Sequence, residues 1–225
     1  MKEFSVLEFK SDVIIVVGHF GCGKTNVSVN LAEYLSKDNK TYLIDYDNVN
    51  PYFRSADSRD YLSGLGVTVI SSDFANTNVD IPSVSPLVYT ALTAAQNKGK
   101  VIFDVGGDMT GAISLGYLHD KLKELHPEVL YVFSAYRPLT DTLEKAYQIL
   151  KEIEASCGFS VTALVNNSNT GAATDLSEIE ETDGYAKKLS EISGIPLLFT
   201  SYMTEKAPDI DGEVLRIKNR TKILF

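Results

Sequence analysis

The chain has 225 residues, a formal net charge of −9 and 44% hydrophobic residues, so it can bury the core of one large domain. The negative charge makes no strong case for DNA binding, because contact with a phosphate backbone needs clustered Lys and Arg. No apolar run approaches the ~20 residues of a membrane span. The start of the chain also lacks the apolar core of a signal peptide, so we expect a cytoplasmic protein.

The first predicted elements surround a glycine-rich loop. Residues 3–10 alternate loosely and predict an edge strand, and the apolar run at 13–17 predicts a buried strand. Residues 18–25 then read Gly-His-Phe-Gly-Cys-Gly-Lys-Thr, and helical spacing follows over about 24–36. The pattern G-x-x-x-x-G-K-[ST] between a strand and a helix is typical of a P-loop, which binds nucleoside triphosphates.

This loop has the chemistry that a triphosphate requires. Glycines let consecutive backbone N–H groups converge on an anion, and the start of the helix adds its positive end. Lys24 is expected to bind the β and γ phosphates as a catalytic residue, and Thr25 to offer its hydroxyl to Mg²⁺. The predicted nucleotide contacts of the loop are Gly21, Cys22, Gly23, Lys24, Thr25 and Asn26.

Two carboxylates follow the next predicted strand, at 40–44. Asp45 and Asp47 are separated by one residue, and alternate side chains of an extended segment point the same way. We expect one of them to join the Mg²⁺ shell and the other to orient the attacking water. The alternative is that both carboxylates only form a turn before Pro51.

The middle of the chain continues the alternation of strands and helices. Residues 52–66 predict a short helix, and 67–70 predict a strand. Residues 71–86 are rich in Ser, Asp, Asn and Pro and predict a long functional loop. A helix is expected over 86–97, ending at Gly99.

A second acidic motif ends the strand predicted at 100–104. Asp104 closes the apolar run Val-Ile-Phe at 101–103 and is followed by Gly106 and Gly107, which is the Walker B type of pattern. We expect Asp104 to hold Mg²⁺ through a water and Gly107 to place an N–H near the γ-phosphate. The alternative is that Asp104 merely caps the next turn.

The remaining pattern completes an α/β fold. Helical spacing recurs over 115–125, a helix is expected to begin near Asp141 with a capping box to Glu144, and 177–193 predict one or two helices interrupted at 183–184. Further strands are predicted at 129–133, 161–165 and 196–199. This order predicts a three-layer P-loop NTPase fold, with a mostly parallel sheet between helices and a single domain over residues 1–225.

Asparagines at the end of the 161–165 strand are candidates for the base site. The amide of Asn166 or Asn167 can donate to and accept from a purine edge at once. No N-K-x-D motif occurs there, which favours adenine over guanine. Residues 200–204 form a loop that could close over the base. The alternative is a pair of turn asparagines.

Together these motifs resemble those of the MinD/ParA group of P-loop ATPases, within the CobQ/CobB/MinD/ParA domain. Besides the loop, they are Leu-Ile-Asp-Tyr-Asp-x-x-Asn-Pro at 43–51 and Val-Ile-Phe-Asp-x-Gly-Gly at 101–107. The resemblance covers nearly the whole chain. It implies an ATPase that needs ATP and Mg²⁺, forms an ATP-dependent homodimer and acts as a switch on an unknown protein partner. By position it also implies that Asp45 and Asp104 serve the metal, that Asp47 orients the attacking water, and that Asn166 reads the purine.

One position departs from that family. The family's loop begins K-G-G, with a lysine that reaches the partner's nucleotide, and here His19 and Phe20 follow Gly18. Histidine is mostly neutral at pH 7 and does not replace a permanent cation. Arg54 and Arg137 are alternative sources of the charge.

Two other functions compete with the switch. An ATP-dependent carboxylate-activating synthetase of the CobB or dethiobiotin type would use the 71–86 loop as a substrate pocket. A non-hydrolysing nucleotide-binding module is compatible with His19. The basic and apolar tail at 214–225 also offers contact with an anionic membrane, although such tails more often pack onto the domain.

Overall fold

The computed structural model describes residues 7–46, 58–71, 85–107, 115–169 and 174–220. Within them the chain forms a central eight-stranded sheet with the order β3-β2-β4-β1-β5-β6-β7-β8. Every neighbouring pair of strands is parallel. The strands are β1 (Val13–Val17), β2 (Thr41–Tyr46), β3 (Thr68–Ser71), β4 (Lys100–Val105), β5 (Glu128–Phe133), β6 (Ala163–Asn166), β7 (Leu197–Tyr202) and β8 (Val214–Arg216).

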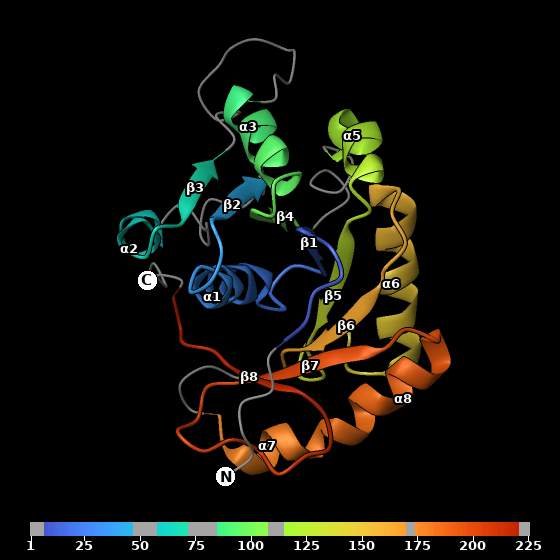
Figure 1. The fold of residues 1–225 in the computed structure, drawn as a ribbon. Coiled ribbons are helices and arrows are strands. Elements are labelled where there is room, and N and C mark those ends of the chain that lie inside the picture. The colour runs from blue at the N-terminus through green and yellow to red at the C-terminus, as the bar shows by residue number, and fades with distance from the viewer. Residues whose placement is uncertain (1–6, 47–57, 72–84, 108–114, 170–173, 221–225) are drawn as a thin grey trace.

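Helices lie on both faces of the sheet (Figure 1). They are α1 (Lys24–Leu35), α2 (Arg59–Gly64), α3 (Pro86–Ala95), η3 (Leu115–Leu118), α5 (His119–Glu124), α6 (Leu143–Cys157), α7 (Leu176–Glu181) and α8 (Asp183–Ser193). This arrangement confirms the predicted three-layer α/β fold of P-loop NTPase type.

Two apolar clusters hold the layers together, one on each face. Along β1 the side chains alternate between them: Val13, Ile15 and Val17 pack toward α3, α5, α6 and α8. Ile14 and Val16 pack toward α1 and α2. The period of two is that of a strand, and burial on both faces explains why β1 is apolar at every position.

The parallel topology positions the site. All strands run the same way, so their carboxyl ends meet at one edge of the sheet, where ligands bind in open α/β folds. β1 lies between β4 and β5, and β2 lies beyond β4. The phosphate loop after β1 is therefore beside the ends of the two strands that carry Asp45 and Asp104.

Two local predictions need correction. The predicted edge strand covered residues 3–10. The structure describes 7–10 of these, and they are not in a strand. Helix α6 begins at Leu143, near Asp141 as predicted, but its N-cap is Thr142, whose hydroxyl accepts from the Lys145 N–H. The Asp141 carboxylate instead pairs with the Lys145 ammonium at 2.7 Å.

The end of the described chain joins the sheet. Val214–Arg216 forms β8, parallel to β7, and Ile217 is 1% exposed in the core. The membrane contact of the tail remains a prediction. No helix in the described ranges combines the length and hydrophobicity that crossing a bilayer requires.

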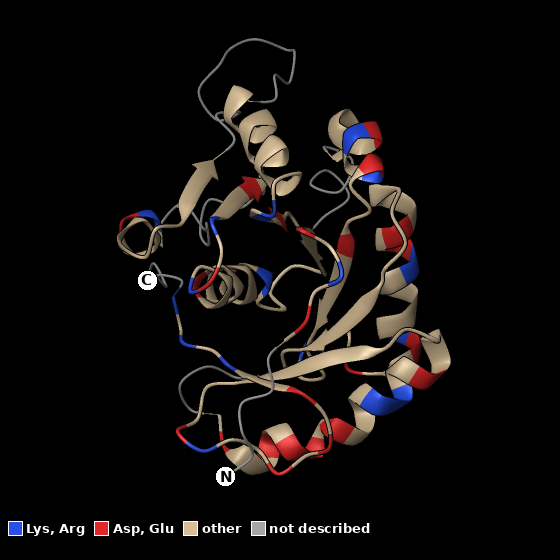
Figure 2. Ribbon diagram, in the orientation of Figure 1, with Lys and Arg blue, Asp and Glu red and all other residues tan. Residues whose placement is uncertain are grey.

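Many charged residues lie on the outer helices, and others lie on the connecting loops (Figure 2). Acidic residues are frequent on α7, which carries Glu178, Glu180 and Glu181. Lysines and arginines are spread over several elements. The prediction about DNA rests on the net charge of the sequence and stays a prediction.

Candidate functional site

The phosphate loop turns directly from β1 into α1. Gly23 is the N-cap of α1 and has φ of 87°, a left-handed conformation that favours glycine. A Cβ at this position would also collide with the Asn167 side-chain amide. Gly23 thus allows the chain to enter α1 while the N–H groups of the first turn stay available at its positive end.

Lys24 is a buried cation within this loop. The residue is 6% exposed, and its Nζ donates to the carbonyl oxygen of His19 at 3.1 Å. No carboxylate among the described residues lies within ion-pair distance of this ammonium. A buried charge is costly without a counter-ion, so the ammonium is suited to an anionic ligand.

Asp45 and Asp104 lie side by side on neighbouring strands. They are register partners in the β2–β4 pair and are 2% and 1% exposed. Ser28 of α1 donates from its hydroxyl to Asp104 Oδ1 at 3.1 Å. Both carboxylates therefore face α1, the helix that the phosphate loop opens, as the motif analysis predicts.

Gly107 packs directly against the phosphate loop. A Cβ on this residue would lie 2.6 Å from Lys24 Nζ and 2.6 Å from the Phe20 backbone nitrogen. Any side chain there would displace the lysine or the loop. Gly107 is thus in contact with the loop, while its distance from a γ-phosphate stays a prediction.

These residues fit a magnesium–nucleotide complex. Asp45, Asp104 and the Thr25 hydroxyl are hard oxygen donors of the kind that Mg²⁺ prefers, and the buried Lys24 ammonium suits a phosphate. Among the described residues, no group of three or more His, Cys, Asp and Glu side chains forms a metal site by itself. A metal held by these oxygen donors would take its remaining ligands from phosphates and waters.

His19 stands where the resembled family has a lysine. It is 6% exposed, and neither ring nitrogen has a hydrogen-bond partner among the described residues. Burial and the positive charges of Lys24 and Arg137 lower its pKa to about 4. The imidazole is therefore neutral at pH 7, in agreement with the sequence argument.

The side-chain amide of Asn166 makes its hydrogen bonds inside the protein. The residue is 0% exposed, and its Nδ2 donates to the hydroxyls of Thr182 and Thr200 at 3.0 and 3.5 Å. Its Oδ1 accepts from the N–H and the hydroxyl of Ser168. An amide has two N–H donors and one carbonyl oxygen. Both kinds of group are already used in Asn166, so none is left for a purine.

The neighbouring asparagines connect the phosphate loop to a second polar position. Asn167 Nδ2 donates to the Cys22 carbonyl at 2.7 Å, and Asn167 Oδ1 accepts from Asn169 Nδ2 at 3.0 Å. Asn169 Nδ2 also lies 3.2 Å from the Ser201 carbonyl oxygen. Backbone carbonyls only accept, so both amides have a fixed orientation.

Asn169 is the residue that sequence reasoning missed. It is 8% exposed, and its Oδ1 is buried without a hydrogen-bond partner among the described residues. A buried acceptor left unpaired is costly, so this atom is suited to a ligand donor. The spacing from Asn167 to Asn169 was the only signal available in the sequence.

Several predicted residues cannot be placed. Asp47 and Arg54 lie outside the described residues, as does most of the 71–86 loop.

Arg137 is exposed in the turn after β5, close enough for its charge to act on His19. Tyr202 ends β7, and the predicted base loop at 200–204 begins within that strand.

Comparisons with known proteins support the fold. The chain is similar to Signal Recognition Particle 54 kDa protein from Aeropyrum pernix K1 in complex with GDP, with 16% identity and a TM-score of 0.54 over 86% of this chain and 42% of that one. It is also similar to the signal recognition particle receptor FtsY from Elizabethkingia anophelis in complex with GDP, with 22% identity and a TM-score of 0.56 over 86% and 58%. Cell division protein FtsY from Thermotoga maritima gives 23% identity and a TM-score of 0.53 over 92% and 66%.

The chain spans between 42% and 66% of the length of the solved structures that it matches. No protein-family model matches it, and no curated protein sequence matches it. At these identities the likeness establishes a P-loop NTPase-like fold. The finer resemblance to MinD/ParA rests on the sequence motifs.

Proposed function

We propose that this chain binds and hydrolyses a nucleoside triphosphate and acts as a nucleotide-dependent switch on a protein partner. The observation that carries the proposal is the buried Lys24 ammonium, which lies at the start of α1 with only a backbone carbonyl as its hydrogen-bond acceptor among the described residues. Phosphate is the anion that this combination of cation, glycine turn and helix start suits best.

The proposed roles follow from position. The first N–H groups of α1 and Lys24 hold the β and γ phosphates, while Thr25, Asp45 and Asp104 hold Mg²⁺. When bound, the metal neutralises charge that develops on the phosphates. Asp47 is proposed to orient the attacking water, a role that the resemblance to the MinD/ParA group implies.

ATP is the proposed nucleotide, with GTP as the competitor. The motifs resemble ATPases and lack N-K-x-D, whereas two of the similar structures are complexes with GDP. We propose that Asn169 Oδ1 accepts from the base, in place of Asn166. A single acceptor pairs with the adenine amino group or with a guanine ring N–H.

The switch role rests on the packing of Gly107 against Lys24 and the loop. A γ-phosphate bound by Lys24 would meet this segment, so loss of the phosphate would change its contacts. An ATP-dependent homodimer is proposed from the resemblance to the MinD/ParA group. The non-hydrolysing module remains the second candidate, favoured by the neutral His19 within the loop.

Phosphate release and nucleotide binding together test the proposal. We expect the parent chain to bind and hydrolyse ATP with Mg²⁺, Lys24→Ala to lose binding, and Asp47→Ala to keep binding but lose hydrolysis. Light scattering with and without ATP tests the homodimer. Tight binding without phosphate release would select the module, and equal turnover by Asp47→Ala would remove the role of Asp47.

A further inference from the structure

His19 is a buried polar side chain of the phosphate loop whose ring forms no hydrogen bond within the described residues. It is 6% exposed, and both ring nitrogens are buried without a partner there. A neutral imidazole carries one N–H donor and one acceptor. Leaving both unpaired in the interior costs free energy, so the ring is suited to a ligand that pairs with at least one of them.

The residue lies where the loop, Lys24 and Gly107 meet. The backbone carbonyl of His19 accepts from Lys24 Nζ at 3.1 Å. A Cβ on Gly107 would lie 2.9 Å from the His19 carbonyl carbon and 2.6 Å from Lys24 Nζ. A phosphate that binds the Lys24 ammonium beside Gly107 is therefore next to His19 as well.

The charged groups that act on the ring are both positive. Burial, then Lys24 of the loop and Arg137 of the turn after β5, lower its pKa to about 4, and the Phe20 backbone opposes them only in part. β5 flanks β1 on the side opposite β4. From β4, the segment packed against the loop presents Gly107, which carries no charge. An anion placed among these groups would favour the imidazolium, because opposite charge stabilises the ionised form.

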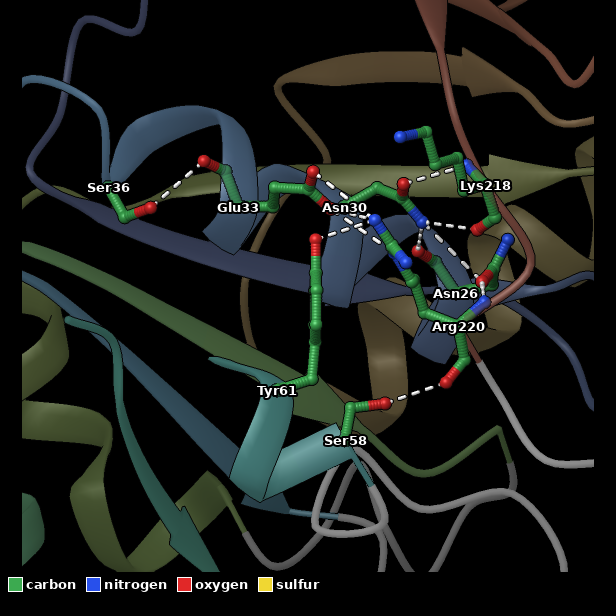
Figure 3. A network of polar contacts seen from close by, with 8 residues as sticks. All are labelled: Asn26, Asn30, Glu33, Ser36, Ser58, Tyr61, Lys218 and Arg220. Carbon is green, nitrogen blue, oxygen red and sulfur yellow. Dashed lines mark hydrogen bonds and ion pairs between the residues drawn. The ribbon is translucent and has the colours of Figure 1, made fainter. Parts of the chain in front are cut away.

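The helix that follows the loop is held by contacts that do not involve His19. Figure 3 shows polar side chains of α1 on the chain segment that follows β8. Asn30 donates from Nδ2 to the Lys218 carbonyl and accepts from the Lys218 N–H, both at 2.8 Å. Glu33 forms an ion pair with Arg220 at 3.1 Å. Helix α1 therefore keeps its place without a bond from the imidazole, which stays available to a ligand.

We propose that His19 is a γ-phosphate contact that distinguishes the triphosphate from the diphosphate. One ring N–H donates to an oxygen atom of the γ-phosphate beside Lys24 and Gly107. The inference rests on the proposed function, because the phosphate belongs to the nucleotide of that site. The added negative charge favours the imidazolium, so the imidazole takes up one proton from solvent when the triphosphate binds. The diphosphate lacks the γ-phosphate and leaves the ring neutral.

The experiment measures proton uptake when Mg²⁺ and a non-hydrolysable ATP analogue bind. Calorimetric titrations at pH 6 in buffers with different ionisation enthalpies give the number of protons taken up, and Mg·ADP provides the comparison. The matching GTP analogue and GDP replace them if the parent binds guanine nucleotides instead. His19→Gln is titrated in parallel, since an amide does not ionise and the protons that the nucleotide itself exchanges then cancel.

The expected difference between parent and His19→Gln is about 0.5 to 1 proton with the analogue, because a ring returned to its ordinary pKa of 6.5 is mostly charged at pH 6. With Mg·ADP the difference should be close to zero. The affinity of the parent for the analogue should also rise relative to His19→Gln as the pH falls from 7 to 5, because the complex binds the extra proton.

Substitution by leucine separates a ligand contact from a structural role. His19→Leu removes both ring nitrogens and keeps an apolar side chain in the buried space. Its affinity for the analogue should fall about tenfold or more at pH 7, because a hydrogen bond to a charged oxygen is lost. Its affinity for Mg·ADP should stay within about threefold of the parent, and its thermal unfolding midpoint should not fall, since unpaired polar atoms are no longer buried. His19→Gln keeps an N–H donor and should recover part of the affinity.

His119 provides a matched histidine control. It lies on α5, and its ring contacts are with Phe159 and the Gly158 carbonyl. His119→Gln should therefore match the parent in proton uptake and in both affinities.

The outcomes separate the two claims. A parent that binds the analogue with the same proton uptake as His19→Gln overturns the inference alone, as does parental affinity in His19→Leu. Equal uptake with the analogue and with Mg·ADP also overturns it, because the imidazole would then meet the β-phosphate. A parent chain that binds neither nucleotide overturns the proposed function, and the γ-phosphate contact with it.

Discussion

The two halves of the carboxyl edge are built from different chemistry. At the ends of β1, β2 and β4 the polar side chains are charged and buried: Lys24, Asp45 and Asp104 are all nearly inaccessible. At the ends of β6 and β7, neutral amides and hydroxyls bond to one another, with Asn167 linking them to the Cys22 carbonyl. The first half suits a metal and phosphates, and the second suits the edge of a base.

The two halves differ in how much they need a ligand. Buried charges need a counter-ion, so the phosphate half leaves a clear requirement for a ligand. Buried amides can satisfy each other, so the amide half needs a ligand only where one atom is left over. That atom is Asn169 Oδ1 among the described residues of this cluster.

The largest expected effect comes from filling the close contact in the phosphate half. In Gly107→Ala the new methyl group would lie against Lys24 Nζ and the Phe20 nitrogen. We expect nucleotide affinity to fall by about 2 to 3 kcal/mol, or roughly 30-fold to 150-fold. Thermal stability should fall as well, because the new methyl group also meets backbone atoms of the loop. Gly116→Ala is the control, because a Cβ there meets no atom within 4 Å. Parental affinity in Gly107→Ala would contradict the close contact.

A smaller effect separates the two asparagines of the amide half. Asn169→Ala removes the available acceptor and should weaken nucleotide binding about tenfold, since one hydrogen bond to a buried group is lost. Asn166→Ala leaves buried hydroxyls unpaired, so it should lower the denaturation midpoint while affinity stays within about twofold. Calorimetric titration with ATP and GTP, together with thermal unfolding, checks both. If Asn166→Ala weakened nucleotide binding and Asn169→Ala did not, the proposed base contact would belong to Asn166.

The smallest effect is the pH dependence that His19 contributes. Its pKa is about 4 in the folded chain and 6.5 in the unfolded one, so below pH 6.5 the unfolded state binds a proton that the folded state does not. Stability therefore rises with pH between 4 and 6.5, and this residue should cost about 1 kcal/mol between pH 6.5 and 5.5. Urea denaturation of His19→Gln should lack this component. Identical pH profiles for variant and parent would contradict the burial of a neutral imidazole.

Most of the fold was accessible from sequence because the central strands are buried on both faces. The apolar runs that begin near residues 13, 100 and 129 became β1, β4 and β5 with ends that differ by one residue at most. Local hydrogen bonds were harder to predict: Asp141 and Thr142 are adjacent, and only the geometry selects Thr142 as the cap. The strand β8 is short and takes its place from pairing with β7, which no local pattern indicates.

The two halves of the site also differ in how well the sequence predicts them. The phosphate half follows from residue types at fixed spacing, so Lys24, Asp45 and Asp104 were found from the sequence and lie on the predicted edge. The amide half depends on which partner each amide finds across strands. Asn166 and Asn169 are the same residue type, and only their contacts with Thr182, Thr200 and Ser201 distinguish them.

The central claim is that the first loop of the chain holds a triphosphate with Mg²⁺. Isothermal titration calorimetry of the parent chain with Mg·ATP, repeated with Mg·GTP, tests it most directly. The account predicts saturable binding of one nucleotide per chain, weakened when Mg²⁺ is chelated and absent in Lys24→Ala. No heat with either nucleotide at saturating concentration, or equal binding by parent and Lys24→Ala, would contradict it.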